Sequence, residues 1–216
     1  DIERMLESGS VARAIERIRH TPYYEALSHA LDRYQQEGSL FALEVALDLE
    51  HRRALWHMIQ GLEGVDRAHA LRLLGTMVDA DNLLWAIRYR VYHHLSEQEI
   101  INYTLPFGYE VHDQDIRAIA RGGEIEPVLE RVYRNVDGLA QISFSDPRAG
   151  LQRLERALAE LLVKRCRATF VGEPFHVGLP IAYLLLSEQE TRNLISVIEA
   201  KASRLGREAL EAMLVL

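Results

Sequence analysis

Two segments of the chain carry polar side chains of the types that bind metals, hold partners or transfer protons. The first segment contains Asp79, Asn82 and Arg90, and the second contains Glu190, Asn193 and Lys201. In both segments these residues occupy positions i, i+3 and i+11, which lie on one face of an α-helix. Asn82 and Asn193 are 111 residues apart, and the other two pairs have the same separation. The chain therefore contains a repeat.

Asp79 and Arg90 are eleven residues apart in the sequence. That separation is roughly 16 Å along a helix axis, which is too far for the two side chains to pair. Each therefore needs a partner on another helix, in the other repeat or on another protein. We interpret these residues as buried polar groups that stabilise the packing between the repeats. Direct contact with a partner protein is the alternative, and catalysis is the least favoured role.

Nine histidines raise the question of a metal site. The groups that could supply ligands are His51 with His57, His93 with His94, and His112 with Asp113 and Asp115. None of them has two ligands four residues apart with a third acid or thiol in register, which is the pattern of a zinc-binding helix. No serine or cysteine is flanked as a nucleophile. We predict no catalytic residue, no metal and no cofactor.

Helices are the only regular structure for which the sequence gives evidence, because alternating β-branched runs are almost absent. Besides the two polar segments, helices are expected over residues 2–19 with a break at Gly9, 22–37, 40–60, 97–103, 113–121, 127–138 and 147–169. Ser96 with Glu99 forms a capping box that opens the helix over 97–103. The first polar segment belongs to a helix that is expected to begin with Asp66 as its N-cap and to continue to about His94. Thr76 with Asp79, and Ser187 with Glu190, have the spacing of a capping box. Either a helix begins at these points or one long helix passes through them with a kink.

The repeat extends beyond the polar segments. Leu40, Leu43, Leu47 and Gly61 match Leu151, Leu154, Leu158 and Gly172 at the same separation. This period exceeds that of any common solenoid repeat, so each copy is expected to be a small helical bundle. We predict an all-α protein with two repeated bundles, residues 1–121 and 122–216, which meet near Gly122 and Gly123.

The composition excludes several function classes. A net charge of −7 argues against nucleic acid, which requires a basic surface. The single cysteine, Cys166, cannot form an internal disulfide, and a reducing, cytoplasmic setting is expected. The longest apolar run, about ten residues over 177–186, is shorter than the roughly 20 that a membrane-spanning helix needs. We therefore expect no direct insertion into a membrane.

Three stretches together resemble the C-subunit family of bacterial and archaeal V-type (A-type) ATPases and ATP synthases, which is related to the d subunit of the eukaryotic vacuolar ATPase. They are the helix over 76–90 with Asp79 and Asn82, the Leu105-Pro106-Phe107-Gly108 turn, and the segment over 183–198 with Glu190 and Asn193. The resemblance covers essentially the whole chain. It implies helical bundles stacked into a funnel-like socket. Members of that family carry three bundles, so the first is expected to be missing from this chain, which also lacks an initiator Met.

The resemblance also implies a function. A protein of this family is not an enzyme; it seats the rotating central shaft on the membrane rotor ring and transmits torque, coupling ATP hydrolysis or synthesis to ion transport. The implied partners are the rotor shaft subunits and the membrane ring subunits. The implied location is the cytoplasm, peripheral to the cytoplasmic face of the membrane. Two other hypotheses are an unrelated helical-repeat scaffold that binds cytosolic proteins, and a helical enzyme with a metal held by histidines and acids.

Overall fold

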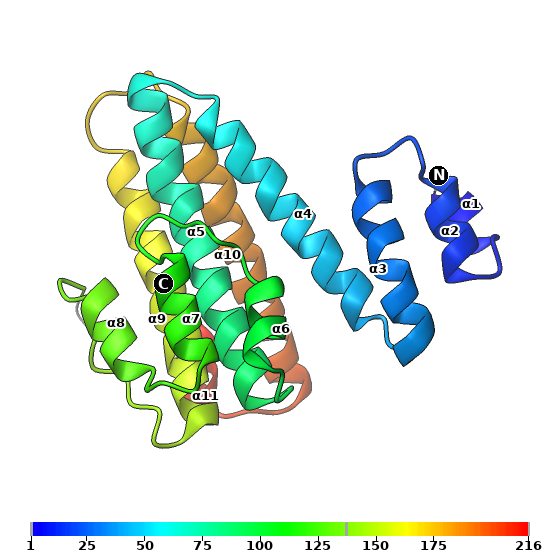
Figure 1. Cartoon of the computed structure of the whole chain (residues 1–216). Helices are drawn as coiled ribbons and strands as arrows, with labels where there is room; N and C mark the ends of the chain where they lie inside the picture. Colours follow the sequence, from blue (N-terminus) through cyan, green and yellow to red (C-terminus); the bar gives the residue numbers. More distant parts are fainter. Residues whose placement is uncertain (1, 137, 216) are drawn as a thin grey trace. The chain divides into compact units, whose positions relative to one another are not determined.

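The computed structural model describes residues 2–136 and 138–215, and within these residues it contains helices and no strand (Figure 1). The prediction of an all-α fold is confirmed. The helices are α1 (Ile2–Leu6), α2 (Val11–Arg17), α3 (Tyr23–Glu37), α4 (Phe41–Gln60), α5 (Gly64–Val91), α6 (Glu97–Asn102), α7 (Asp113–Ala120), α8 (Glu126–Val132), α9 (Pro147–Thr169), α10 (Gly178–Ala202) and α11 (Arg207–Met213). No described helix is both long enough and apolar enough to cross a membrane.

The chain divides into two compact units, residues 1–58 and 59–216. The predicted repeats, 1–121 and 122–216, are a division by sequence correspondence, and they stay a prediction, as does the funnel-like socket. In the first unit, the buried side chains of Ile15, Ile18, Leu27 and Leu43 form a core. Its helices end where local sequence signals indicate: Ser10 caps α2, and Gly38, at φ 67°, ends α3.

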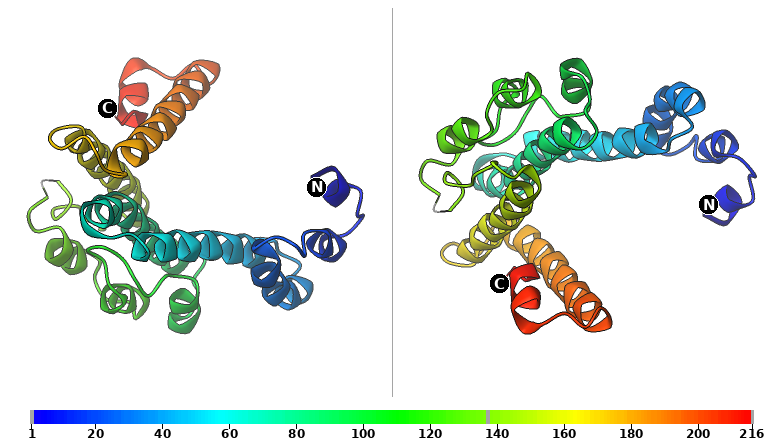
Figure 2. Two further views of the ribbon diagram at one scale, coloured as in Figure 1. Left: turned by 90° about the horizontal axis from the view of Figure 1, so that it is seen from above. Right: turned by 90° about the horizontal axis from the view of Figure 1, so that it is seen from below.

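In the second unit α5 is the central helix. It contacts α6, α7, α9 and α10, while α9 and α10 also pack against each other (Figure 1). Seen along the bundle, α10 and α11 lie on the opposite side of α5 and α9 from α6, α7 and α8 (Figure 2). A helix that contacts neighbours on so many sides must be apolar almost all round. This explains why α5 buries Leu73, Val78, Leu83, Ala86 and Ile87 completely.

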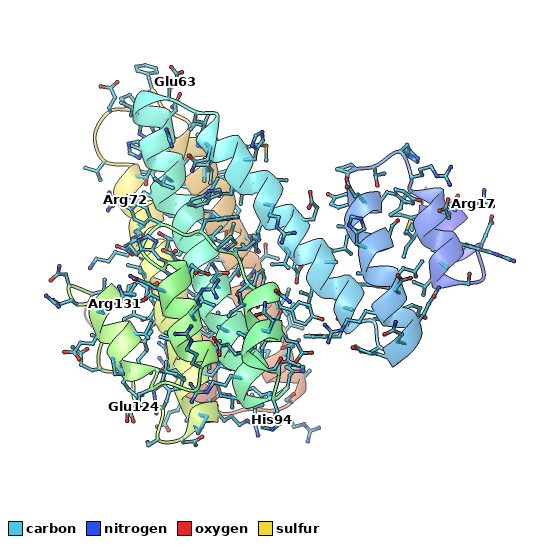
Figure 3. The ribbon with its side chains drawn as sticks, viewed as in Figure 1. Arg17, Glu63, Arg72, His94, Glu124 and Arg131 are labelled. Carbon is cyan, nitrogen blue, oxygen red and sulfur yellow. The ribbon has the colours of Figure 1, made fainter. Side chains whose placement is uncertain are left out.

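The two helices that hold the polar segments, α5 and α10, are called the key helices, and each is one continuous helix. Glu63 precedes the start of α5 and His94 lies just past its end (Figure 3). The Thr76 hydroxyl donates to the Arg72 carbonyl at 2.5 Å inside α5 and does not cap a new helix. The second key helix, α10, likewise runs through Ser187. Of the two alternatives left open by the capping-box spacing, the long helix is the one observed.

Some of the other helix ends lie where the local sequence predicted them, and others do not. Ser96 and Glu99 form the expected capping box of α6, and α9 has the expected bounds with Asp146 as its N-cap. The expected helix over 127–138 is shorter, because Tyr133 leaves helical geometry at φ −113° and ψ 31°. Asp66 was expected to cap α5. It lies instead in the first turn of α5, where its carboxylate accepts a hydrogen bond from the Val177 N–H at 2.7 Å.

Candidate functional site

Asp79 lies in the middle of α5 with its side chain fully buried. Its carboxylate accepts three backbone N–H groups from one loop, those of Tyr109 at 2.8 Å, Glu110 at 2.8 Å and Val111 at 3.2 Å. The chain can approach so closely because residue 108 is glycine. A Cβ at Gly108 would lie 2.2 Å from the Asp79 Oδ1 atom. The carboxylate therefore ties the loop over 105–111 to the central helix.

The environment of Asp79 changes its acidity. Burial raises the pKa of Asp79 from 3.8 to about 6, and the Glu110 carboxylate adds to the rise. The N–H donors of the loop oppose the shift, because they favour the charged form. Near neutral pH, Asp79 is a buried carboxylate whose hydrogen-bonding capacity is taken up by the backbone.

Asn82 holds the same loop one helical turn further along α5. Its amide nitrogen donates to the carbonyls of Leu105 and Phe107, each at 3.1 Å, and its amide oxygen accepts from the Leu105 N–H at 2.8 Å. The side chain thus pairs with Leu105 as a neighbouring strand would. The Leu105-Pro106-Phe107-Gly108 turn is positioned by this pairing.

Arg90 completes the polar face of α5 at its C-terminal end. Its guanidinium donates to the carbonyls of Ile119 at 3.1 Å, Gly122 at 3.0 Å and Gly123 at 2.5 Å. These carbonyls belong to the last turn of α7 and the residues after it, where a cation is favoured because the final carbonyls have no partner within the helix. Arg90 therefore fixes α7 against α5.

The partners of Asp79, Asn82 and Arg90 are all backbone groups between residues 105 and 123. The sequence led us to expect that Asp79 and Arg90 stabilise packing between the repeats. In the structure their partners lie in the segment that directly follows their own helix, up to Gly122 and Gly123 at the predicted boundary between the repeats, and a role in packing between the repeats stays a prediction.

The second copy repeats part of this arrangement. Asn193 donates from its amide nitrogen to the Val215 carbonyl at 2.7 Å and accepts from the Val215 N–H at 3.1 Å. Within the described residues, the only non-glycine residues with positive φ are His94 at 51° and Arg204 at 53°. Each lies just past the end of a key helix. His94 and Arg204 are 110 residues apart, as are Leu105 and Val215, whereas the polar residues of the two segments are 111 apart. The turn after the key helix is therefore one residue shorter in the second copy.

Glu190 and Lys201, the counterparts of Asp79 and Arg90, lie on α10 with exposed side chains. The structure therefore brings Asp79, Asn82 and Arg90 together around one loop and one helix end. In the second copy, Asn193 alone makes the corresponding hydrogen bonds. Whether Glu190 and Lys201 face a partner stays a prediction.

Arg165 was not predicted as part of this site. This buried residue of α9 donates to the Thr76 hydroxyl on α5 and to the Glu110 carboxylate at 2.7 Å, and its guanidinium lies 5.4 Å from the centre of the Tyr109 ring. It connects α9 to α5 and to the loop that Asp79 holds. A signal was present in the sequence, since Arg165 occupies a position on the apolar stripe formed by Leu154, Leu158 and Leu161.

The histidines and the acidic residues beside them were the candidates considered for a metal site. His69 and His176 stack with ring centres 3.7 Å apart, and burial lowers the pKa of His69, with help from the nearby His176 and Arg72. Asp115, which the sequence placed beside His112, is buried and forms an ion pair with Arg131. No three histidine, cysteine or acidic side chains come together as a metal site in the part of the chain that the structure describes. The polar groups of α5 are arranged to hold backbone in place.

Comparison with known protein families identifies the family of this chain. The family model described as ATP synthase (C/AC39) subunit matches residues 1–213. The chain belongs to this family. Its membership agrees with the resemblance seen in the two Asn-Leu helices and the Leu-Pro-Phe-Gly turn, and it disfavours an unrelated helical scaffold.

Individual relatives of the family are distant but match along the whole chain. The C subunit of the A-type ATP synthase of Methanocaldococcus jannaschii is 25% identical over 218 residues, which cover 99% of this chain and 54% of that protein. The C subunit of the Methanothermobacter thermautotrophicus enzyme is 27% identical over 205 residues, covering 93% and 52%. That of Haloferax volcanii is 23% identical over 218 residues, covering 100% and 61%. The chain thus spans little more than half the length of these relatives. No solved structure matches it.

Proposed function

We propose that this chain is part of a non-catalytic central-stalk adaptor of a rotary A/V-type ATPase. In this role it seats the rotating shaft on the membrane rotor ring and transmits torque between them. Family membership over residues 1–213 supports a subunit of such a complex. The location proposed with it is the cytoplasmic face of the membrane, as a peripheral part of the complex.

One observation supports the mechanical part of the proposal: the polar side chains of α5 hold neighbouring parts of the backbone in place. Asp79, Asn82 and Arg90 bind backbone groups of the following loop and of α7, and Arg165 joins α9 to the same loop. Side chains committed in this way resist movement of the elements that they join, because a change would leave buried polar groups without partners. A subunit that passes torque requires such stiffness, whereas an enzyme requires reactive groups that are free to meet a substrate.

Pairwise binding experiments test the proposed partners. The purified chain is mixed separately with the shaft subunits and with the membrane ring in detergent, both from the A-type complex of the same organism, and each affinity is measured by biolayer interferometry. The C subunit of Methanocaldococcus jannaschii, with its own shaft and ring, serves as the reference. Binding to both partners supports the adaptor role. A folded chain that binds neither contradicts it and favours the scaffold hypothesis.

A further inference from the structure

The loop between α9 and α10 ends on two stacked histidines. His69, in the second turn of α5, and His176, just before α10, lie with their rings parallel and the ring centres 3.7 Å apart. Asp66 fixes the next residue of the loop, because its carboxylate accepts the Val177 N–H at 2.7 Å. The end of the loop is thus attached to the N-terminal end of α5 (Figure 1).

The first turn of α10 packs directly against the stack. A Cβ at Gly178 would lie 2.7 Å from the Cβ of His69 and 2.8 Å from the Nδ1 atom of His176, so only glycine allows this approach. The Nδ1 atom of His176 is buried there, and within residues 2–136 and 138–215 no group forms a hydrogen bond with it. The end of the loop is therefore held by ring packing with one hydrogen bond beside it.

This arrangement favours neutral histidines. An imidazolium ring carries a proton on both nitrogens, and in His176 the Nδ1 proton would be buried without an acceptor. A positive charge on His176 is also opposed by the N-terminal end of α10, because a helix N-terminus has a positive partial charge. Charges on both rings would repel each other at the distance of the stack. The packing is therefore most favourable when both rings are neutral.

The charged groups around His69 act in both directions. Burial lowers the pKa of His69, and His176 and Arg72 lower it further, whereas the Asp66 carboxylate raises it. Because the net shift is downward, folding favours the neutral form of His69. The resulting stabilisation is fully present above the ordinary pKa of 6.5 and is lost as the pH falls through the lower pKa of the folded protein.

We propose that the His69–His176 stack is a latch that holds the end of the α9–α10 loop on α5 near neutral pH and releases it on acidification. Uptake of a proton from solvent by either ring breaks the stack, the Val177 N–H leaves Asp66, and the first residues of α10 open to water. The effect is opposite to that of Asp79, whose uptake of a proton stabilises the folded state, so the latch opens locally while the bundle stays folded. This inference stands independently of the proposed rotary function.

Amide hydrogen exchange measured by mass spectrometry tests the latch, because it reports local opening segment by segment. Protection of the unaltered chain is compared at two pH values after correction for the intrinsic exchange rate at each. For the N–H groups of Val177, Leu179 and Ile181, we expect protection at about pH 5 to be at least about tenfold lower than at about pH 7.5, since one linked proton changes an equilibrium by up to tenfold per pH unit. Amides in the middle of α5 are expected to keep their protection.

Three variants identify the groups that take up the proton. His69→Phe with His176→Phe keeps two aromatic rings and removes both titrating groups, so its loop is expected to be equally protected at both pH values. Asp66→Asn keeps an acceptor for the Val177 N–H but removes the charge that favours protonation of His69, and the midpoint of release is expected to move to lower pH. His57→Phe, at an exposed histidine of α4, is the matched control and is expected to release its loop as the unaltered chain does.

Two results would overturn the proposal. One is loop protection in the unaltered chain that does not change with pH. The other is a doubly substituted variant that is folded by circular dichroism and whose loop still opens on acidification, because the opening would then come from other groups. A midpoint of release that rises in Asp66→Asn would likewise contradict uptake of the proton by this stack.

Discussion

Asn82 and Leu105 exchange two hydrogen bonds, one from the Leu105 N–H to the Asn82 amide oxygen at 2.8 Å and one from the Asn82 amide nitrogen to the Leu105 carbonyl at 3.1 Å. Asn193 and Val215 make the same exchange in the second copy. In both copies the asparagine of the key helix binds one backbone residue of the segment that follows the helix, and so fixes where that segment packs against the helix. The repeat is therefore a repeated packing arrangement as well as a repeated sequence.

The loss of this pairing is expected to be costly in the first copy. Asn82→Ala leaves the N–H and carbonyl of the buried Leu105 without partners, and we expect a decrease of about 2–4 kcal/mol in the free energy of unfolding. Asn193→Ala is the matched comparison, and because Asn193 is only half-buried, water can replace part of its pairing and a decrease of about 1 kcal/mol is expected. Urea unfolding measures both. An Asn82→Ala variant as stable as the unaltered protein would contradict the role of the pairing.

The acidity of Asp79 predicts a dependence of stability on pH. Because its pKa is raised from 3.8 to about 6 in the folded protein, the folded state binds a proton that the unfolded chain does not bind between these values. The resulting stabilisation is fully present below about pH 4 and is lost as the pH rises through 6.

Asp79→Asn removes this titration while keeping the shape of the side chain. We expect the stability of the unaltered protein relative to Asp79→Asn to increase by up to about 3 kcal/mol as the pH falls from 7 to 4. Unfolding in urea at a series of pH values measures the difference. A difference that stays constant over this range would show that the pKa of Asp79 is not raised.

Gly108 is required by the close approach of the loop to α5. In Gly108→Ala the new Cβ would lie 2.2 Å from the Asp79 carboxylate and 2.3 Å from the Val111 carbonyl, so the loop must shift and the hydrogen bonds to Asp79 must lengthen. We expect a loss of about 1–3 kcal/mol of stability. Gly206→Ala is the control, because a Cβ there meets no atom within 4 Å, and only the weaker N-cap of α11 is expected to cost stability, by less than about 1 kcal/mol. Equal effects of the two substitutions would rule out the steric explanation.

Arg165 is expected to contribute to stability through its polar contacts. Arg165→Met keeps most of the volume but leaves Thr76 and Glu110 without their donor, and a loss of about 1–3 kcal/mol is expected, as measured by urea unfolding. Tyr133→Phe is a comparison in the same region. The buried Tyr133 hydroxyl has no hydrogen-bond partner among the described residues, so its removal is expected to leave stability unchanged or to increase it. A larger loss of stability in Tyr133→Phe than in Arg165→Met would show that the polar contacts of Arg165 do not stabilise this region.

The sequence predicted the elements that local signals determine. Ser96 with Glu99, Asp146 before Pro147, and Gly38 mark helix ends whose positions depend on neighbouring residues, and these ends were found as expected. Thr76 with Asp79 has the same local signal without being a helix start. There the apolar residues on both sides, Leu73 and Leu83, are buried together in one helix, and tertiary packing prevails over the cap.

The partners of the polar residues were not predictable in the same way. Asp79, Asn82 and Arg90 bind backbone groups, and a backbone N–H or carbonyl leaves no mark on the identity of the residue that supplies it. In the second copy, the loss of one residue before Arg204 shifts the alignment, so Val215 does not stand at the expected position opposite Asn193.

The adaptor proposal requires that one molecule hold the shaft and the ring at the same time, and a bridging measurement tests this most directly. The membrane ring is immobilised, the chain is added, and the shaft subunits are then supplied with and without the chain present. We predict that the shaft is retained on the ring only when the chain is present. Retention of the shaft to the same extent without the chain, or no retention with a folded chain, would contradict the proposed function.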